Sequence, residues 1–340
     1  YLRHALQPGR ELIDTAPGYQ RRLRWTNKKR SLLIESFLLN IPVPPIFLFE
    51  HDYNEYEVID GRQRLETIRA FLANNFALTG LEYWPELERK RFNDLPSVLQ
   101  KVLLRRSLSA VVLLAETRGV DTDELDVRRV LFDRLNTGGI RLNPQELRNA
   151  LYPGRLNALL IRLARSKAFT TTWGIPPFVQ GETEEPSEAL LKNPLFSSLA
   201  DAELVLRFFA LRDAIANKRT GSLRRILDRY MDEHKNITQD KEAEMEAMYL
   251  ALLSRLVELF DSEPFRLPKT KRPSRPLYDA LMIALSLSAD IDLEAKSKSV
   301  RESLVAALSN EATYDILVGR GNTIESIRQR VELASQILNA

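Results

Sequence analysis

The stretch YEVIDGRQRLETI (residues 56–68) decides the fold of the N-terminal part of the chain, because its apolar pattern changes from that of a strand to that of a helix. The strand pattern ends at residue 60. Beyond it, a helical period predicts one apolar face made of Leu65, Ile68, Leu72 and Phe76. At the junction an acid, a glycine and two arginines follow one another: Asp60, Gly61, Arg62, Gln63 and Arg64.

The flanking sequence predicts further strands and helices around this junction. Residues 27–39 have a helical pattern that ends before the prolines of IPVPP. Residues 46–50 and 56–60 are predicted to pair as a hairpin. Farther along, we expect a helix at 95–105, a buried strand at 108–116, a helix at 121–135, and a helix beginning at the capping-box-like Asn143, Pro144 and Glu146.

The second half of the chain differs from the first in composition and in hydrophobic pattern. TTWGIPPFVQGETEEPSE (residues 171–188) is rich in proline, glycine and acid and predicts a linker or a mobile insertion. After it only helical patterns follow, at 200–217, 222–234, 240–260, 276–289, 293–309 and 322–338. The predicted fold class is α/β plus all-α, with an N-terminal α+β domain (1–155), a helix and linker (156–198) and an all-helical interaction domain (199–340).

Composition narrows the classes of function. The chain has 340 residues, of which 44% are hydrophobic and 28% charged, as expected for a two-domain globular protein. It has no cysteine, which excludes zinc-thiolate sites and thiol nucleophiles and fits a reducing, cytoplasmic location. Three histidines far apart in sequence make a histidine-rich metal site an unfavourable interpretation. No apolar run reaches 18 residues, so no transmembrane helix is predicted.

The strand-to-helix junction has the chemistry of a phosphate site. The first turn of a helix presents unsatisfied N–H groups and a partial positive charge. Gly61 would let the backbone approach a ligand, while Arg62 and Arg64 add forked donors that match phosphate oxygens. Asp60 could cap the helix, orient an arginine, bind Mg²⁺ or polarise water. The alternative is an ordinary aspartate cap in an exposed turn, and five residues alone do not exclude it.

Two other stretches of the same predicted domain suit anions. The loop Asn136, Thr137, Gly138, Gly139 offers consecutive N–H groups, although it could simply end a helix. Residues 1–30 hold eight basic and two acidic residues, a net charge of +6, although these could be a solvated surface. Three anion-friendly elements in one domain favour a shared phosphate pocket.

In this order, the elements resemble the domain-of-unknown-function 262 family, the N-terminal module of GmrSD-type modification-dependent restriction systems. The resemblance is dense over about residues 17–155 and rests on YQRRLRW (19–25), LIESFLLNIPVPPIFLFE (33–50), YEVIDGRQRLETI (56–68) and FDRLNTGGIRLNPQELRNALY (132–152). It implies a ParB/sulfiredoxin-like fold that binds a nucleoside triphosphate, with Mg²⁺, and in some members hydrolyses it. The nucleotide-binding residues that it implies are Gln20, Arg21, Gly61, Arg62, Arg64 and Asn136, Thr137, Gly138 and Gly139, with Asp60 and Gln63 as catalytic candidates and Asp60 as the metal ligand.

The sequence departs from the family pattern in three places. Arg62 replaces a glutamine, which puts hydrolysis in doubt more than binding, and Glu66 stands where threonine is common. Glu66 would repel phosphate if it faced the pocket, but one turn from Arg62 it is placed to pair with that arginine. Many relatives carry a C-terminal His–Asn–His nuclease. Here the C-terminal half has one histidine, His234, so we expect the chain not to be a nuclease by itself.

Three functions stay open at this point. The first is a nucleotide-responsive regulatory subunit of a phage-defence or restriction system, which controls a separate nuclease or effector. The second is a DNA-binding sensor of foreign or modified DNA, with Arg22, Arg24, Lys28, Lys29 and Arg30 on the backbone. The third is an antitoxin-like interaction protein with a degenerate pocket, for which the neutral helical half would provide a partner or homodimer surface.

Overall fold

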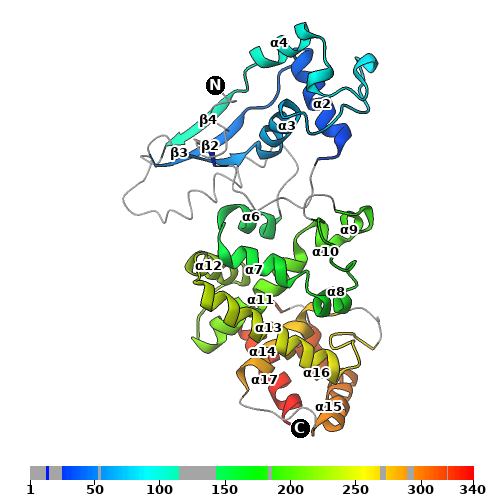
Figure 1. Cartoon of the computed structure of the whole chain (residues 1–340). Coiled ribbons are helices and arrows are strands. Elements are labelled where there is room, and N and C mark those ends of the chain that lie inside the picture. The colour runs from blue at the N-terminus through cyan, green and yellow to red at the C-terminus, as the bar shows by residue number, and fades with distance from the viewer. Residues whose placement is uncertain are drawn as a thin grey trace. The chain divides into compact units, whose positions relative to one another are not determined.

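We describe a computed structural model that places residues 13–14, 25–52, 55–114, 143–182, 186–268, 273–288, 295–319 and 321–340. The chain divides into two compact units, Tyr1–Arg141 and Leu142–Ala340. This division is consistent with the predicted class of α/β followed by helices, because the first unit holds all the described strands and the second contains helices (Figure 1).

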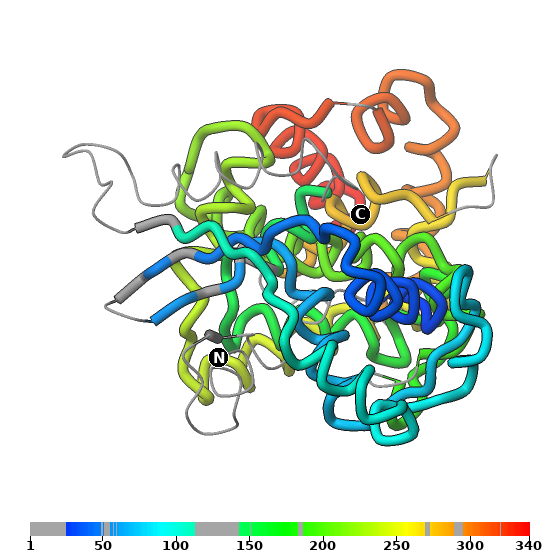
Figure 2. Tube along the Cα trace, turned by 90° about the horizontal axis from the view of Figure 1, so that it is seen from above, coloured from blue at the N-terminus to red at the C-terminus, as the bar shows by residue number. Residues whose placement is uncertain are grey.

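The first unit is built on a small mixed sheet with the strand order β1-β3-β2-β4. The predicted hairpin is confirmed, since β2 (Ile46–Asp52) and β3 (Glu55–Asp60) pair antiparallel. The short β1 (Ile13–Asp14) lies parallel to β3, and β4 (Ala110–Leu114) lies parallel to β2. Figure 2 shows the three longer strands running side by side.

Three helices accompany this sheet: α2 (Asn27–Leu38), α3 (Arg62–Leu72) and α4 (Ser97–Arg105). Each falls where the apolar period predicts a helix. Leu65 of α3 is buried against Ile46 and Leu48 of the sheet, which fixes α3 on the strand that it follows. A larger core joins α2, α3 and α4 with the turns η1 (Pro85–Leu87) and η2 (Phe92–Asp94), around the fully buried Phe71.

Two details of the sequence prediction are wrong. Phe76 does not lie on α3, because the helix ends at Leu72 and Phe76 reaches the core from the following loop. The strand at 110–114 is not buried: the side chains of Val111 and Val112 are 41% and 40% exposed. In the sheet of the described residues β4 is an edge strand that pairs with β2 alone, and an apolar run does not by itself distinguish an edge from a centre.

A buried carboxylate holds the loop after α3 onto α2. The Glu35 side chain is 3% exposed and accepts hydrogen bonds from the backbone N–H groups of Glu82, Tyr83 and Trp84 at 3.1, 2.9 and 3.0 Å. One turn earlier on α2, the Ser31 hydroxyl accepts from the Thr79 N–H at 2.9 Å. These contacts give the backbone donors of the loop hydrogen-bond partners on α2.

Glu35→Gln is therefore expected to destabilise the first unit by about 2–3 kcal/mol, because a neutral amide oxygen accepts these N–H groups more weakly and its NH₂ group faces donors. Chemical denaturation followed by circular dichroism measures the loss. Glu82→Gln is the matched control: it removes one charge from the same loop, but its side chain is exposed. An equal, small effect of both substitutions would contradict the structural role of Glu35.

The second unit is helical. The six predicted C-terminal helices are all present, with ends within a few residues of the predicted ones, and α16 is one that the sequence analysis missed. Its helices are α6 (Pro144–Leu151), α7 (Arg155–Leu163), α8 (Lys167–Trp173), α9 (Glu188–Lys192), α10 (Pro194–Ser197), α11 (Ala200–Ala216), α12 (Leu223–His234), α13 (Gln239–Leu259), α14 (Arg275–Leu287), α15 (Ser297–Ser309), α16 (Glu311–Val318) and α17 (Ile324–Leu338).

Helices α11 and α14 form the centre of this unit and are buried on nearly every side. They are joined by a buried ion pair, in which the Arg207 Nε donates to both carboxylate oxygens of Asp279 at 3.1 Å. The coulombic attraction of Asp279 raises the pKa of Arg207 although burial opposes this shift. Among the described residues, we find no helix whose length and apolar character would let it cross a membrane.

The proline-rich stretch after α8 is held by a second buried pair. The Arg165 guanidinium donates to the two Glu182 carboxylate oxygens at 2.6 and 2.7 Å, and one of these oxygens also accepts from the Val179 N–H at 3.0 Å. Ile175, at the start of the stretch, is buried as well. Residues 175–182 thus pack as part of the second unit.

Candidate functional site

The turn between β3 and α3 is made by one glycine. Gly61 has φ +96°, a left-handed conformation that glycine adopts without strain. A Cβ on this residue would lie 2.3 Å from the Ile46 Cγ2 atom of the neighbouring strand. Both the dihedral angle and the contact require glycine, so the N-terminus of α3 sits directly against the sheet. Gly61 caps this helix without a side-chain hydrogen bond.

Asp60 and Arg64 flank this turn and bind each other. The Arg64 Nη2 donates to the Asp60 Oδ2 at 2.7 Å and to the Pro45 carbonyl at 3.3 Å. The Arg64 side chain is only 13% exposed, and its Nε, also buried, has no hydrogen-bond partner within the described part of the chain. The structure therefore shows Asp60 orienting an arginine, one of the roles that the sequence leaves open.

The second arginine of the turn is also paired. The Arg62 Nε donates to the Glu66 Oε1 at 2.7 Å, which confirms the predicted pairing one turn along the helix. The first turn of α3 contains no acidic residue, so both carboxylates reach its arginines from outside that turn. The arrangement places two cations and two anions around the helix N-terminus.

Gln63, a predicted catalytic residue, connects α3 to the chain that precedes α2. Its Oε1 accepts a hydrogen bond from the Trp25 N–H at 3.3 Å, and its carbonyl accepts from the Thr67 hydroxyl at 2.7 Å. Trp25 packs, partly buried, against the core of the first unit. The role of Gln63 in hydrolysis stays a prediction.

The other predicted site residues divide into two groups. Gln20, Arg21, Arg22, Arg24 and the Asn136, Thr137, Gly138, Gly139 loop lie outside the described residues. Lys28 and Lys29 are exposed at the start of α2, with the Lys29 Nζ 4.9 Å from the centre of the Trp25 ring. Arg30 instead lies over the Phe76 ring, 4.0 Å from its centre, and is partly buried. In the described part of the chain no three acidic or histidine side chains group as metal ligands.

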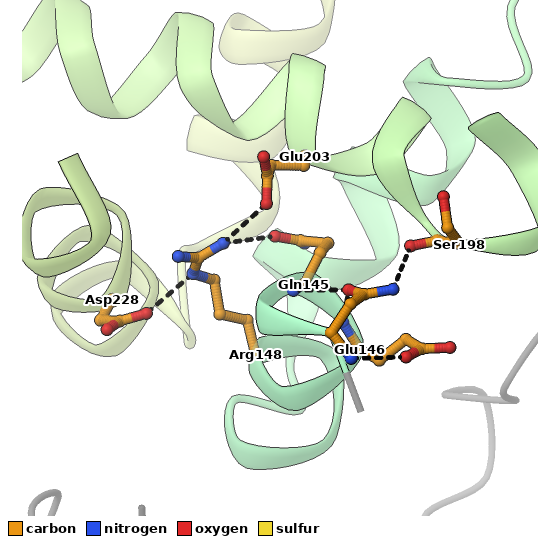
Figure 3. Close-up of polar contacts among 7 residues, drawn as sticks. Gln145, Glu146, Arg148, Ser198, Glu203 and Asp228 are labelled. Carbon is orange, nitrogen blue, oxygen red and sulfur yellow. Dashed lines mark hydrogen bonds and ion pairs between the residues drawn. The ribbon is translucent and has the colours of Figure 1, made fainter. Parts of the chain in front are cut away.

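A polar cluster that the sequence analysis missed lies on α6, in the second unit (Figure 3). Arg148 is 2% exposed, and its Nε donates to the Asp228 Oδ1 of α12 at 2.7 Å. Its Nη1 donates to Glu203 Oε2 of α11 at 3.0 Å and to Gln145 Oε1 at 3.2 Å. The only signal in the sequence is Gln145, Arg148 and Asn149, whose spacing puts three long or polar side chains on one helical face.

The start of α6 confirms its predicted capping box. The Asn143 side chain accepts from the N–H groups of Gln145 and Glu146, and the Glu146 carboxylate accepts from the Asn143 N–H at 2.8 Å. The Asn143 Nδ2 also donates to the Ser198 carbonyl at 2.8 Å. The start of this short helix is thus tied to the helical unit by polar contacts.

With this geometry described, the comparisons with known proteins can be placed on it. Residues 4–153 match the family model described as the N-terminal domain of the GmrSD restriction endonuclease. This part of the chain is therefore a GmrSD-type N-terminal domain, as the sequence resemblance predicts, and the Asp60–Arg64 turn lies inside it. Comparison with curated proteins and with solved structures finds no significant match.

Gly61→Ala is expected to destabilise the first unit by about 2–4 kcal/mol, since it combines a strained dihedral angle with a clash against Ile46. Urea denaturation measures this loss. Gly80→Ala is the control in the same unit: its φ is +65°, but a Cβ there meets only the flexible stem of Lys28, at 3.0 Å. Equal losses for the two variants would show that the contact with Ile46 has no special weight.

Arg148→Met is expected to destabilise the second unit by about 3–5 kcal/mol, because it leaves Glu203 and Asp228 without their buried cation. Arg155→Met serves as control, as Arg155 pairs with Glu242 but its side chain is 56% exposed, and such pairs contribute about 1 kcal/mol or less. Thermal unfolding of both variants measures the difference. A loss below 1 kcal/mol for Arg148→Met would mean that the cluster does not hold α6.

Proposed function

We propose that the first unit binds a nucleoside triphosphate at the Asp60–Arg64 turn and that the chain is a regulatory or sensor subunit of a prokaryotic restriction or phage-defence system. The observation that carries this proposal is the N-terminus of α3, where Arg62 and Arg64 stand in a first turn with neither a side-chain cap nor an acidic residue. The backbone N–H groups of a helix start, the helix dipole and two guanidinium groups together suit a phosphate chain. The GmrSD-type domain match supports the system to which the function belongs.

The residues of the turn take different roles in this proposal. Arg64 is held by Asp60 and by the Pro45 carbonyl, so it presents a fixed positive charge. Arg62 is more exposed and makes the adjustable phosphate contact. We propose that the early Gln20–Arg21 element and the Asn136–Gly139 loop add phosphate contacts, and that the domain has the ParB/sulfiredoxin-like fold.

Mg²⁺ fits the proposed site in one respect. The Asp60 side chain is 42% exposed. In nucleotide sites, Mg²⁺ is commonly bound by one or two carboxylates together with phosphate oxygens. The ion would neutralise phosphate charge. Hydrolysis also requires a group that positions a water molecule. The Gln63 amide oxygen could do this, but it already accepts a hydrogen bond from the Trp25 backbone N–H. Binding is therefore the function proposed here, and turnover by Asp60 and Gln63 is an addition to it.

The helical unit suits control of a separate protein. Its buried ion pairs lie in the interior, where they cannot take part in chemistry on a substrate: Arg207–Asp279 joins two helices, and Arg165–Glu182 holds the stretch after α8. We propose that this unit transmits the nucleotide state to a nuclease or effector that is a different polypeptide.

Arg64→Ala is expected to weaken triphosphate binding at least tenfold, since a charge-assisted bidentate contact contributes about 1.5–3 kcal/mol. Isothermal titration calorimetry of the full chain with ATP, GTP and CTP, with and without Mg²⁺, measures it. Arg69→Ala is the matched control, an exposed arginine in the last turn of the same helix. Unchanged affinity in Arg64→Ala would remove the turn from the site.

A second candidate function, DNA sensing, has one observation in its favour: Lys28 and Lys29 are exposed side by side at the start of α2. Phosphate contacts of this kind give binding that falls steeply with salt. DNA binding of this type by a chain that shows no nucleotide effect would favour the sensor. Absence of both nucleotide and DNA binding would leave the antitoxin-like interaction protein.

A further inference from the structure

The first turn of α3 is neutralised by its own chain. Arg62 and Arg64 each bind a carboxylate four residues away, at 2.7 Å in both cases, Arg62 toward the C-terminus and Arg64 toward the N-terminus. An incoming phosphate therefore meets paired arginines. To gain a full contact with either guanidinium, the phosphate must compete with the carboxylate that already binds it.

The two ion pairs are not equally easy to exchange. Arg64 is 13% exposed and is held by the Pro45 carbonyl as well as by Asp60. In the other pair the exposed fractions are 24% for Arg62 and 37% for Glu66. Ion pairs that are this accessible to water are weak, because solvent screens them and the long side chains lose entropy on pairing. The Arg62–Glu66 pair is the one that a ligand would open.

The position of the Arg62–Glu66 pair on the helix also favours its opening by a ligand. Arg62 is the first residue of α3, where its charge opposes the helix dipole, and Glu66 follows it by four residues. In a helix, an acidic residue four positions after a basic one stabilises less than the reverse order does. Glu66 is thus a poor permanent partner for Arg62, whereas a phosphate at the helix N-terminus would satisfy both the dipole and the guanidinium.

We propose that Glu66 sets the affinity of the phosphate site by occupying Arg62 until a phosphate group displaces it. The inference rests on the proposed nucleotide function and adds a regulatory residue to it. Glu66 lowers the affinity because it competes with the phosphate for the Arg62 Nε. The site then fills only when the triphosphate concentration is high enough to open the pair.

Glu66→Gln tests the inference as a gain of affinity, which a misfolded variant cannot imitate. We expect its dissociation constant for triphosphates to fall about two- to fivefold, the factor that corresponds to an exposed ion pair. The full chain is titrated by calorimetry with ATP, GTP, CTP and inorganic tripolyphosphate, at low and at physiological salt. Glu86→Gln, an exposed acid of the same unit outside α3, controls for the change in net charge.

A double-mutant cycle shows whether the effect passes through Arg62. With Arg62→Gln already present, Glu66→Gln is expected to bring no further gain. A gain that persists there, or that Glu86→Gln reproduces, would overturn the competition and leave only a general charge effect. Unchanged or weaker binding in Glu66→Gln would overturn the inference while leaving the proposed function intact. If neither the native chain nor any variant binds a triphosphate, the proposed function itself falls, and the inference falls with it.

Discussion

The contact between Gly61 and Ile46 is the constraint on which the first unit depends. It lets β3 turn into α3 within one residue, so that the helix begins where the strand ends. Leu65, one turn along α3, then packs on the same Ile46. A single strand residue therefore sets both the start of the helix and its position on the sheet. Any larger residue at position 61 would push the start of α3 away from β2, the strand that carries Ile46.

Because the turn is this tight, charge gathers around one helix end. Asp60 precedes the glycine, and the two arginines follow it within three residues. Here these charges form two ion pairs at the helix N-terminus. The site is thus preorganised in the position of its donors while being close to neutral in charge. A polyanion must then gain its affinity by replacing carboxylates and by using the backbone N–H groups.

The sequence predicts what is local and misses what is distant. The hairpin, α3, the capping box at Asn143 and the Arg62–Glu66 pair all follow from spacings of two to four residues. By contrast, Glu35 accepts from N–H groups 47 to 49 residues away, and Arg148 binds acids 55 and 80 residues away. No periodicity encodes such pairs. The edge position of β4 is missed for the same reason, because strand order is a property of the whole sheet.

The matched family domain and the first compact unit end at different residues, and helix α6 lies between the two ends. The family match extends to residue 153, yet the first unit ends at Arg141, so α6 belongs to the matched segment and folds with the second unit. Buried polar groups place it there: Arg148 is neutralised by Glu203 and Asp228, and the Asn149 Oδ1 accepts from the Asn157 Nδ2 at 2.8 Å. A fragment that ends at the family boundary would expose this helix with its cation unpaired. The segment that matches a family model can therefore include a helix that folds with the following unit.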